Sequence, residues 1–140
     1  MPQYDSPLNA QDALVALMIG TSVSDENIRT SELMTIERIV NHLPVFADYD
    51  AEHIRTMSTL VFDLFEEEEG VDALLGIVQE SLPERLYETA YALCCDVAAS
   101  DGWLSDQELR MLEEIRHQLA IPRLNAAAIE RGARARHMKV

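Results

Sequence analysis

The chain has 140 residues, of which 48% are hydrophobic and 26% are charged, and its formal net charge is −14. This composition is typical of one globular domain and excludes a disordered chain. The negative charge argues against nucleic acid as a partner. No apolar stretch reaches the roughly 18 residues that a membrane span needs.

The charge is unevenly distributed along the chain. Five basic residues and one acidic residue follow Pro122, so this end carries +4 and the preceding residues carry −18. The acidic body suits divalent cations or basic partners, while the basic end leaves open a peripheral contact with anionic lipid. The first twelve residues lack both the basic and the apolar segment of a secretion signal. We therefore expect a cytoplasmic protein without membrane insertion.

Apolar residues recur at helical spacing along almost the whole chain, and the alternation typical of strands is nearly absent. A Ser-Pro pair begins the first predicted helix, residues 6–23, in which Leu14, Leu17 and Met18 share one face. The second predicted helix, residues 31–43, is amphipathic and ends before a proline.

The third predicted helix covers residues 51–69. Asp50 is placed to cap its first turn, and Gly70 closes it. Its last four residues are all glutamate, and carboxylates at a helix carboxyl end oppose the helix dipole, so fraying is expected there.

Four further helices complete an all-α fold of about seven helices. They are predicted at residues 71–82, 83–100, 106–119 and 124–136. We expect a single domain at residues 8–135 and a basic tail at 136–140, with the residues after about Gly132 peripheral to the core.

The sequence also resembles itself. A shift of 76 residues aligns residues 16–43 with 92–119 and gives nine identical pairs, where ordinary residue frequencies give roughly two. The pairs are Ala16/Ala92, Leu17/Leu93, Ser24/Ser100, Asp25/Asp101, Glu32/Glu108, Leu33/Leu109, Glu37/Glu113, Ile39/Ile115 and Leu43/Leu119. This internal duplication predicts two helical halves, about 8–69 and 70–135, related by a pseudo-twofold axis.

Each half carries an Asp at the end of one predicted helix and a Glu in the first turn of the next. The residues are Asp25 and Glu32 in the first half, and Asp101 and Glu108 in the second. Carboxylate oxygens are the ligands that Ca²⁺ and Mg²⁺ take. If the two turns meet, four acids converge, and such like charges require a cation between them. The pattern predicts a divalent-metal site.

A structural alternative explains part of the same pattern. Ser105 and Glu108 have the spacing of a capping box, which needs no metal. In the first half the corresponding residue is Arg29, yet Glu32 is still present. A pure capping motif has no use for that Glu, although any acid in a first turn gains from the helix dipole.

Catalytic motifs are scarce. Cys94 and Cys95 are adjacent in a predicted helix, where a bridge between neighbours is strained, so we expect two reduced core thiols. The four histidines show no ligand spacing, and the sequence has no phosphate-binding loop or nucleophile motif. We expect no enzymatic activity; metal-assisted chemistry at the four carboxylates is the remaining enzymatic alternative.

The stretch "AASDGWLSDQELRMLEEIRHQLAI" and its first-half echo "SVSDENIRTSELMTIERIVNHLPV" resemble the tellurite-resistance TerB family. Its motif is a helix ending in Ala-x-x-Asp-Gly, followed by Ser/Asp-x-x-Glu at the start of a helix, and the motif is present twice. The resemblance covers roughly residues 8–135. It implies an all-α fold of two halves and a metal site at Asp25, Glu32, Asp101 and Glu108. Glu26 departs from the motif, where the family often has Gly.

The resemblance implies a non-enzymatic stress-response module that binds a divalent cation, Ca²⁺ or Mg²⁺, and an unidentified protein partner. The alternative from the residues alone is a metal-free acidic helical adaptor for a basic protein partner. Both interpretations are compatible with a homodimer.

Overall fold

The computed structural model describes residues 8–23, 30–100, 102 and 104–140, and within these residues it contains helices and no strand. The α-helices are α1 (Ala10–Val23), α2 (Thr30–His42), α3 (His53–Phe65), α4 (Gly70–Ser81), α5 (Tyr87–Ala99), α6 (Asp106–Gln118) and α7 (Arg123–Arg136). Short 3₁₀ turns, η2 (Pro44–Phe46) and η3 (Glu84–Leu86), precede α3 and α5. The predicted all-α fold is confirmed.

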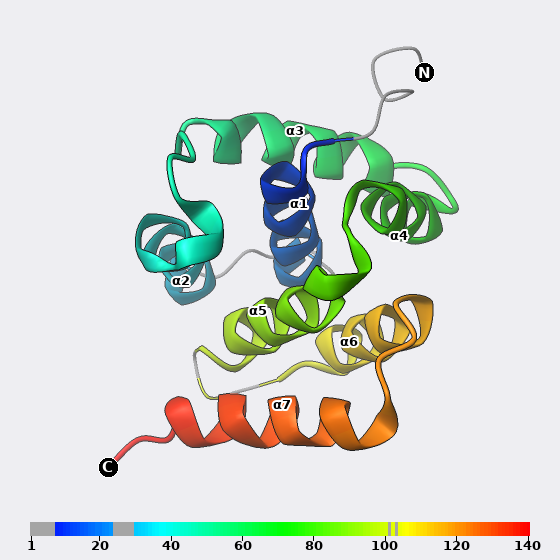
Figure 1. Ribbon diagram of the computed structural model, residues 1–140. Coiled ribbons are helices and arrows are strands. Elements are labelled where there is room, and N and C mark those ends of the chain that lie inside the picture. The colour runs from blue at the N-terminus through cyan, green and yellow to red at the C-terminus, as the bar shows by residue number, and fades with distance from the viewer. Residues whose placement is uncertain (1–7, 24–29, 101, 103) are drawn as a thin grey trace.

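The helices form layers on either side of a central pair (Figure 1). α1 and α5 pack against each other in the middle. α3 packs on α1 and α7 packs on α5, so these two helices form opposite outer faces. α2 and α4 flank α1, and α6 lies beside α5.

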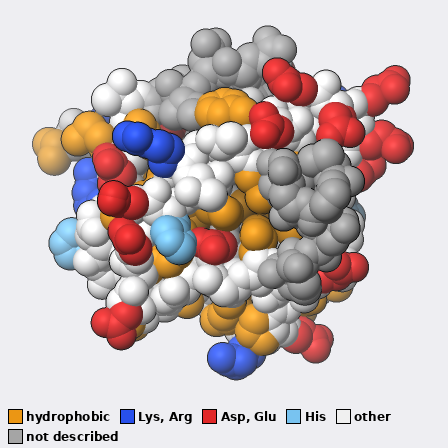
Figure 2. Space-filling model, turned by 90° about the horizontal axis from the view of Figure 1, so that it is seen from above, with side chains coloured by type: hydrophobic (Ala, Val, Ile, Leu, Met, Phe, Trp, Pro, Cys, Tyr) orange, Lys and Arg blue, Asp and Glu red, His pale blue; other side chains and the backbone are white. Residues whose placement is uncertain are grey.

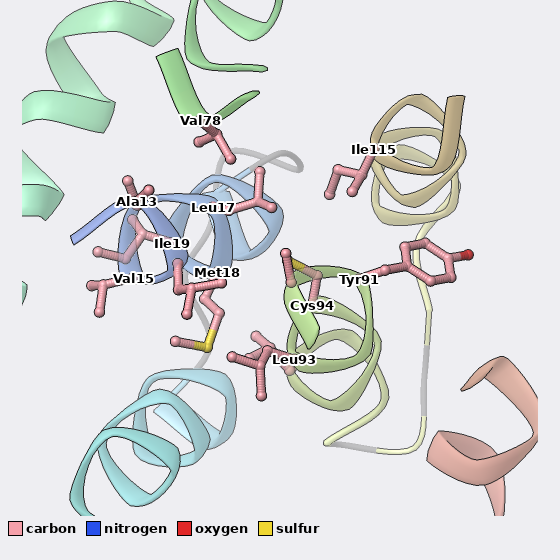
Figure 3. Packing of buried hydrophobic residues seen from close by; sticks show 14 of the residues in the cluster. Ala13, Val15, Leu17, Met18, Ile19, Val78, Tyr91, Leu93, Cys94 and Ile115 are labelled. Atoms are coloured by element: carbon pink, nitrogen blue, oxygen red, sulfur yellow. The ribbon is translucent and has the colours of Figure 1, made fainter. Parts of the chain in front are cut away.

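α1 is the centre of the core. The Asn9 side chain caps its first turn by accepting a hydrogen bond from the Asp12 backbone N–H at 2.7 Å. Leu14, Leu17 and Met18 are buried, and so is every other residue from Ala13 to Val23, which differs from an amphipathic helix with one buried face. Its surroundings explain the difference, because α2, α3, α4, α5 and α6 all pack against it. Figure 3 shows its side chains pointing to several neighbours at once.

The two predicted halves share a pattern of packing. α2 begins at residue 30 and α6 at 106, and they end at 42 and 118, so both helix ends repeat at the 76-residue offset. α1 contacts α2 and α3, as α5 contacts α6 and α7. These shared partners agree with a pseudo-twofold arrangement; the superposition of the two halves remains a prediction.

The third helix is shorter than predicted. α3 ends at Phe65, and the glutamates at residues 66–69 form a turn. Four carboxylates at a helix carboxyl end oppose the dipole, which favours the early end. The prediction that Asp50 is the N-cap is wrong: the N-cap of α3 is Glu52, which makes no side-chain cap hydrogen bond. The Asp50 carboxylate instead accepts a hydrogen bond from the Glu52 backbone N–H at 3.0 Å, in the turn before the helix.

The carboxyl end of the chain is more tightly held than predicted. Ala133 is only 2% exposed against the core. The Arg136 guanidinium donates to Asp96 on α5 at 2.7 and 3.1 Å, and His137 lies 3.3 Å from the same carboxylate oxygen. The expectation that everything after Gly132 is peripheral is therefore wrong up to residue 137.

The surface reflects the acidic composition. In Figure 2, Asp and Glu side chains are spread around the edge of the face on the α3 side of the molecule, with Lys and Arg at few places. Among the described residues, no helix is both long and apolar enough to cross a membrane.

Candidate functional site

Glu108 lies in the first turn of α6 with its side chain fully buried. Its backbone N–H donates to the Ser105 hydroxyl at 3.1 Å, and the Ser105 backbone N–H donates to Glu108 Oε1 at 3.2 Å. The predicted capping box is confirmed. It fixes the start of α6 and holds the Glu108 carboxylate on the inner side of the helix.

Glu32 occupies the corresponding place in α2. It lies in the first turn and is also 0% exposed. The residue that aligns with Ser105 is Arg29, whose side chain has no hydroxyl to complete a capping box. Burying a carboxylate costs several kcal/mol unless hydrogen bonds or a cation compensate it. The burial of Glu32 and Glu108 at matching positions therefore demands a compensating environment in both halves.

The other two predicted ligands, Asp25 and Asp101, lie outside the residues that the structure describes. Within the described ranges, no group of three or more His, Cys, Asp or Glu side chains could hold a metal ion. Glu32 and Glu108 belong to these ranges, whereas the two aspartates do not. The four-carboxylate site thus remains a prediction, with its two glutamates buried as such a site requires.

The two cysteines are buried free thiols, as predicted. Cys94 faces the core and Cys95 lies on the side of α5 toward Tyr91 and Glu130. Burial raises the pKa of the Cys94 thiol from its ordinary value of 9.0 to about 12, against a smaller lowering by a hydrogen bond from Thr21. Burial likewise raises the pKa of Cys95 to about 12. Both thiols therefore stay protonated near neutral pH and are poor nucleophiles.

These thiols predict a loss of stability at alkaline pH. A raised folded-state pKa stabilises the fold below the unfolded value, near 9, and this contribution is lost as pH rises toward 12. Between pH 9 and pH 11 the free energy of unfolding should fall by up to about 1.4 kcal/mol per pH unit for each thiol. Urea unfolding at pH 8, 9, 10 and 11 measures the slope.

The control for this slope is the double variant Cys94→Ala with Cys95→Ala. It removes both thiols and leaves the tyrosines and the net negative charge, which also destabilise the fold at high pH. Its stability should fall less steeply than that of the unmodified chain. Equal slopes would show that the thiols contribute nothing to the pH dependence.

The sequence alone did not reveal a groove of about 770 Å³ between α6 and α7, with α5 as its floor. It contains Tyr91, whose hydroxyl donates to the Glu130 carboxylate at 2.5 Å, and two arginines, Arg116 and Arg134. One sequence signal points there: Arg116 aligns with Val40, which is buried in α2. A charged residue at a core position of the other half marks a place where the two halves differ.

The fold and the buried glutamates define an all-helical domain with a carboxylate in the first turn of two matching helices. The family model described as Tellurite resistance protein TerB matches residues 11–131, and the chain belongs to this family. The predicted resemblance is confirmed. No curated protein and no solved structure gave a significant match to the chain.

Proposed function

We propose that this TerB module is a non-enzymatic, divalent-cation-binding protein of tellurite or stress resistance. Asp25, Glu32, Asp101 and Glu108 would supply the oxygen ligands. The supporting observation is that Glu32 and Glu108, at matching positions in α2 and α6, are both 0% exposed. A set of carboxylates suits Ca²⁺ or Mg²⁺ better than a soft metal.

The main support for this proposal comes from the first half of the chain, because the capping box explains the burial of Glu108 but not that of Glu32. In α6, Ser105 gives Glu108 a structural reason to be buried. In the sequence just before α2, Arg29 stands in place of the serine, so a Ser-x-x-Glu capping box does not explain Glu32. A bound cation would neutralise the carboxylates and tie the α1–α2 turn to the α5–α6 turn. Such a cross-link would make the fold, or a face that contacts a protein partner, respond to cation concentration.

The expected result is a melting temperature that rises when Ca²⁺ or Mg²⁺ is added to chelator-treated protein. Binding to the folded state alone stabilises it by about 2.7 kcal/mol at a hundredfold excess over the dissociation constant. Glu32→Gln and Asp101→Asn should abolish the rise. The matched control is Glu37→Gln, an exposed acid on α2, which should preserve it. Calorimetric titration of the same variants measures the affinity.

A second candidate is the metal-free adaptor that binds a basic protein partner through its acidic surface. The capping box favours it, because Glu108 already has a role without metal. In that case the metal-free and cation-saturated proteins melt at the same temperature in every variant. Binding of the basic partner would also weaken steeply with added salt, since salt screens exposed charges.

A further inference from the structure

The groove between α6 and α7 is mostly apolar, and α5 forms its floor. Figure 3 shows Tyr91 on α5 pointing away from α1, toward the space between α6 and α7. The floor and walls include Tyr91, Cys95, Ala99, Leu109, Leu112 and Ala133. At about 770 Å³ the groove is within the size range of protein binding sites.

The rim of the groove is also apolar and is exposed to solvent. Leu104, Leu109 and Met138 line it and are 37%, 49% and 70% exposed. A small molecule in the trough would leave this rim in water, whereas a longer partner element would cover it. Contiguous exposed apolar surface of this kind marks an interaction site. The rim therefore favours a macromolecular partner.

The charges of the groove distinguish it from the acidic body. Arg116 and Arg134 line it together with Glu113 and Glu130, and neither arginine forms an ion pair with a residue in the described part of the chain. The nearby Glu130 carboxylate accepts a hydrogen bond from the Tyr91 hydroxyl. The His137 imidazole lies 3.3 Å from the Asp96 carboxylate. In a chain of net charge −14, two available guanidinium groups beside an apolar trough suit carboxylates of a partner.

The first half shows that this groove is not a necessity of the fold. Where α6 presents half-buried Arg116, α2 presents Val40, which is 3% exposed. The linker between α2 and α3 also places Phe46 in the core. The connection between α6 and α7 is only residues 119–122. The groove is therefore specific to the residues of the second half.

We propose that this groove binds an amphipathic helix of a protein partner, with its apolar face in the trough and acidic side chains opposite Arg116 and Arg134. Helices that dock in grooves use apolar anchors spaced three and four residues apart. This function goes beyond the cation site, because none of the four proposed ligands lines the groove. It also differs from the adaptor candidate, whose partner is basic.

The test uses a fluorescein-labelled synthetic helix with leucines along one face and glutamates beside them, in a buffer that contains EDTA. Fluorescence anisotropy should show saturable binding to the full chain. The double variant Arg116→Glu with Arg134→Glu should weaken binding about tenfold or more, because like charges then oppose each other. The matched control, Arg123→Glu with Arg131→Glu, makes the same charge change on exposed positions of α7 and should alter binding about twofold at most.

Two further measurements complete the test. A scrambled peptide of the same composition, without a continuous apolar face, should bind far more weakly. Melting curves should show that both double variants are folded. Equal binding by the two double variants, or equal binding of the scrambled peptide, overturns the proposal.

Two other occupants give different outcomes. If the unmodified chain forms a dimer in sedimentation equilibrium and the Arg116→Glu, Arg134→Glu variant is monomeric, the groove is occupied by a second copy and the proposal fails. It also fails if vesicles of phosphatidylcholine and phosphatidylglycerol bind the chain through these arginines and the peptide does not. Because EDTA is present throughout, the absence of a cation site leaves these results unaffected.

Discussion

Replacing Gly70 by alanine is expected to destabilise the domain by about 3 kcal/mol or more. Gly70 begins α4 directly after the turn of glutamates, and an added Cβ would lie 2.1 Å from the Leu64 carbonyl oxygen. That atom belongs to the backbone of α3, so it cannot move aside as a flexible side chain would. The turn between α3 and α4 closes only because this residue has no side chain.

Gly76, in the same helix, is the matched control. A Cβ there has no neighbour within 4 Å. Gly76→Ala should stabilise the fold by about 0.5–1 kcal/mol, because alanine favours a helix interior over glycine. Thermal unfolding should show a melting temperature about 10 °C lower for Gly70→Ala and slightly higher for Gly76→Ala. Similar melting temperatures for the two variants would contradict this account of the turn.

The second large effect is expected at Leu17 in α1. Its side chain is 0% exposed and lies on the side of the helix toward α5 and Ile115 (Figure 3). Leu17→Ala should cost about 3–5 kcal/mol, the range for a buried leucine whose cavity cannot collapse. Urea unfolding measures this value against Leu124→Ala, a residue that is 80% exposed and should change stability by about 0.5 kcal/mol at most.

The aligned residue in the second half, Leu93, extends this test. It is 3% exposed on α5, the partner of α1 in the central pair. If the two halves are equivalent in packing, Leu93→Ala should cost about as much as Leu17→Ala. A cost near that of Leu124→Ala would show that the sequence repeat is not matched by an equivalent role in the core.

The sequence predicted those elements whose limits are set locally. α2 and α6 were placed to within one residue, because an amphipathic pattern, a proline after α2 and a capping box before α6 define their ends. The early end of α3 depends on repulsion between its terminal carboxylates and the helix dipole, which periodicity does not measure. The burial of α1 on all sides depends on which helices surround it, and this is a tertiary property.

The candidate site was predictable to a similar degree. The repeated spacing identified Glu32 and Glu108, and both are buried at helix starts. Their relation to Asp25 and Asp101 depends on loop conformations that sequence spacing does not define. The groove escaped prediction because it is formed by side chains from three helices, and only the exchange of Val40 for Arg116 between the halves indicated it.

The central position of α1 has a consequence for how the chain folds during synthesis. This helix emerges from the ribosome before α5 and α6, yet part of its covering surface comes from those two helices. Until those helices are made, an apolar segment remains exposed to water and to other nascent chains, a state that favours aggregation. We therefore expect that the residues before α5 do not complete their core alone. A ribosome that stalls before α5 leaves behind a chain whose most hydrophobic helix has no completed core to enter.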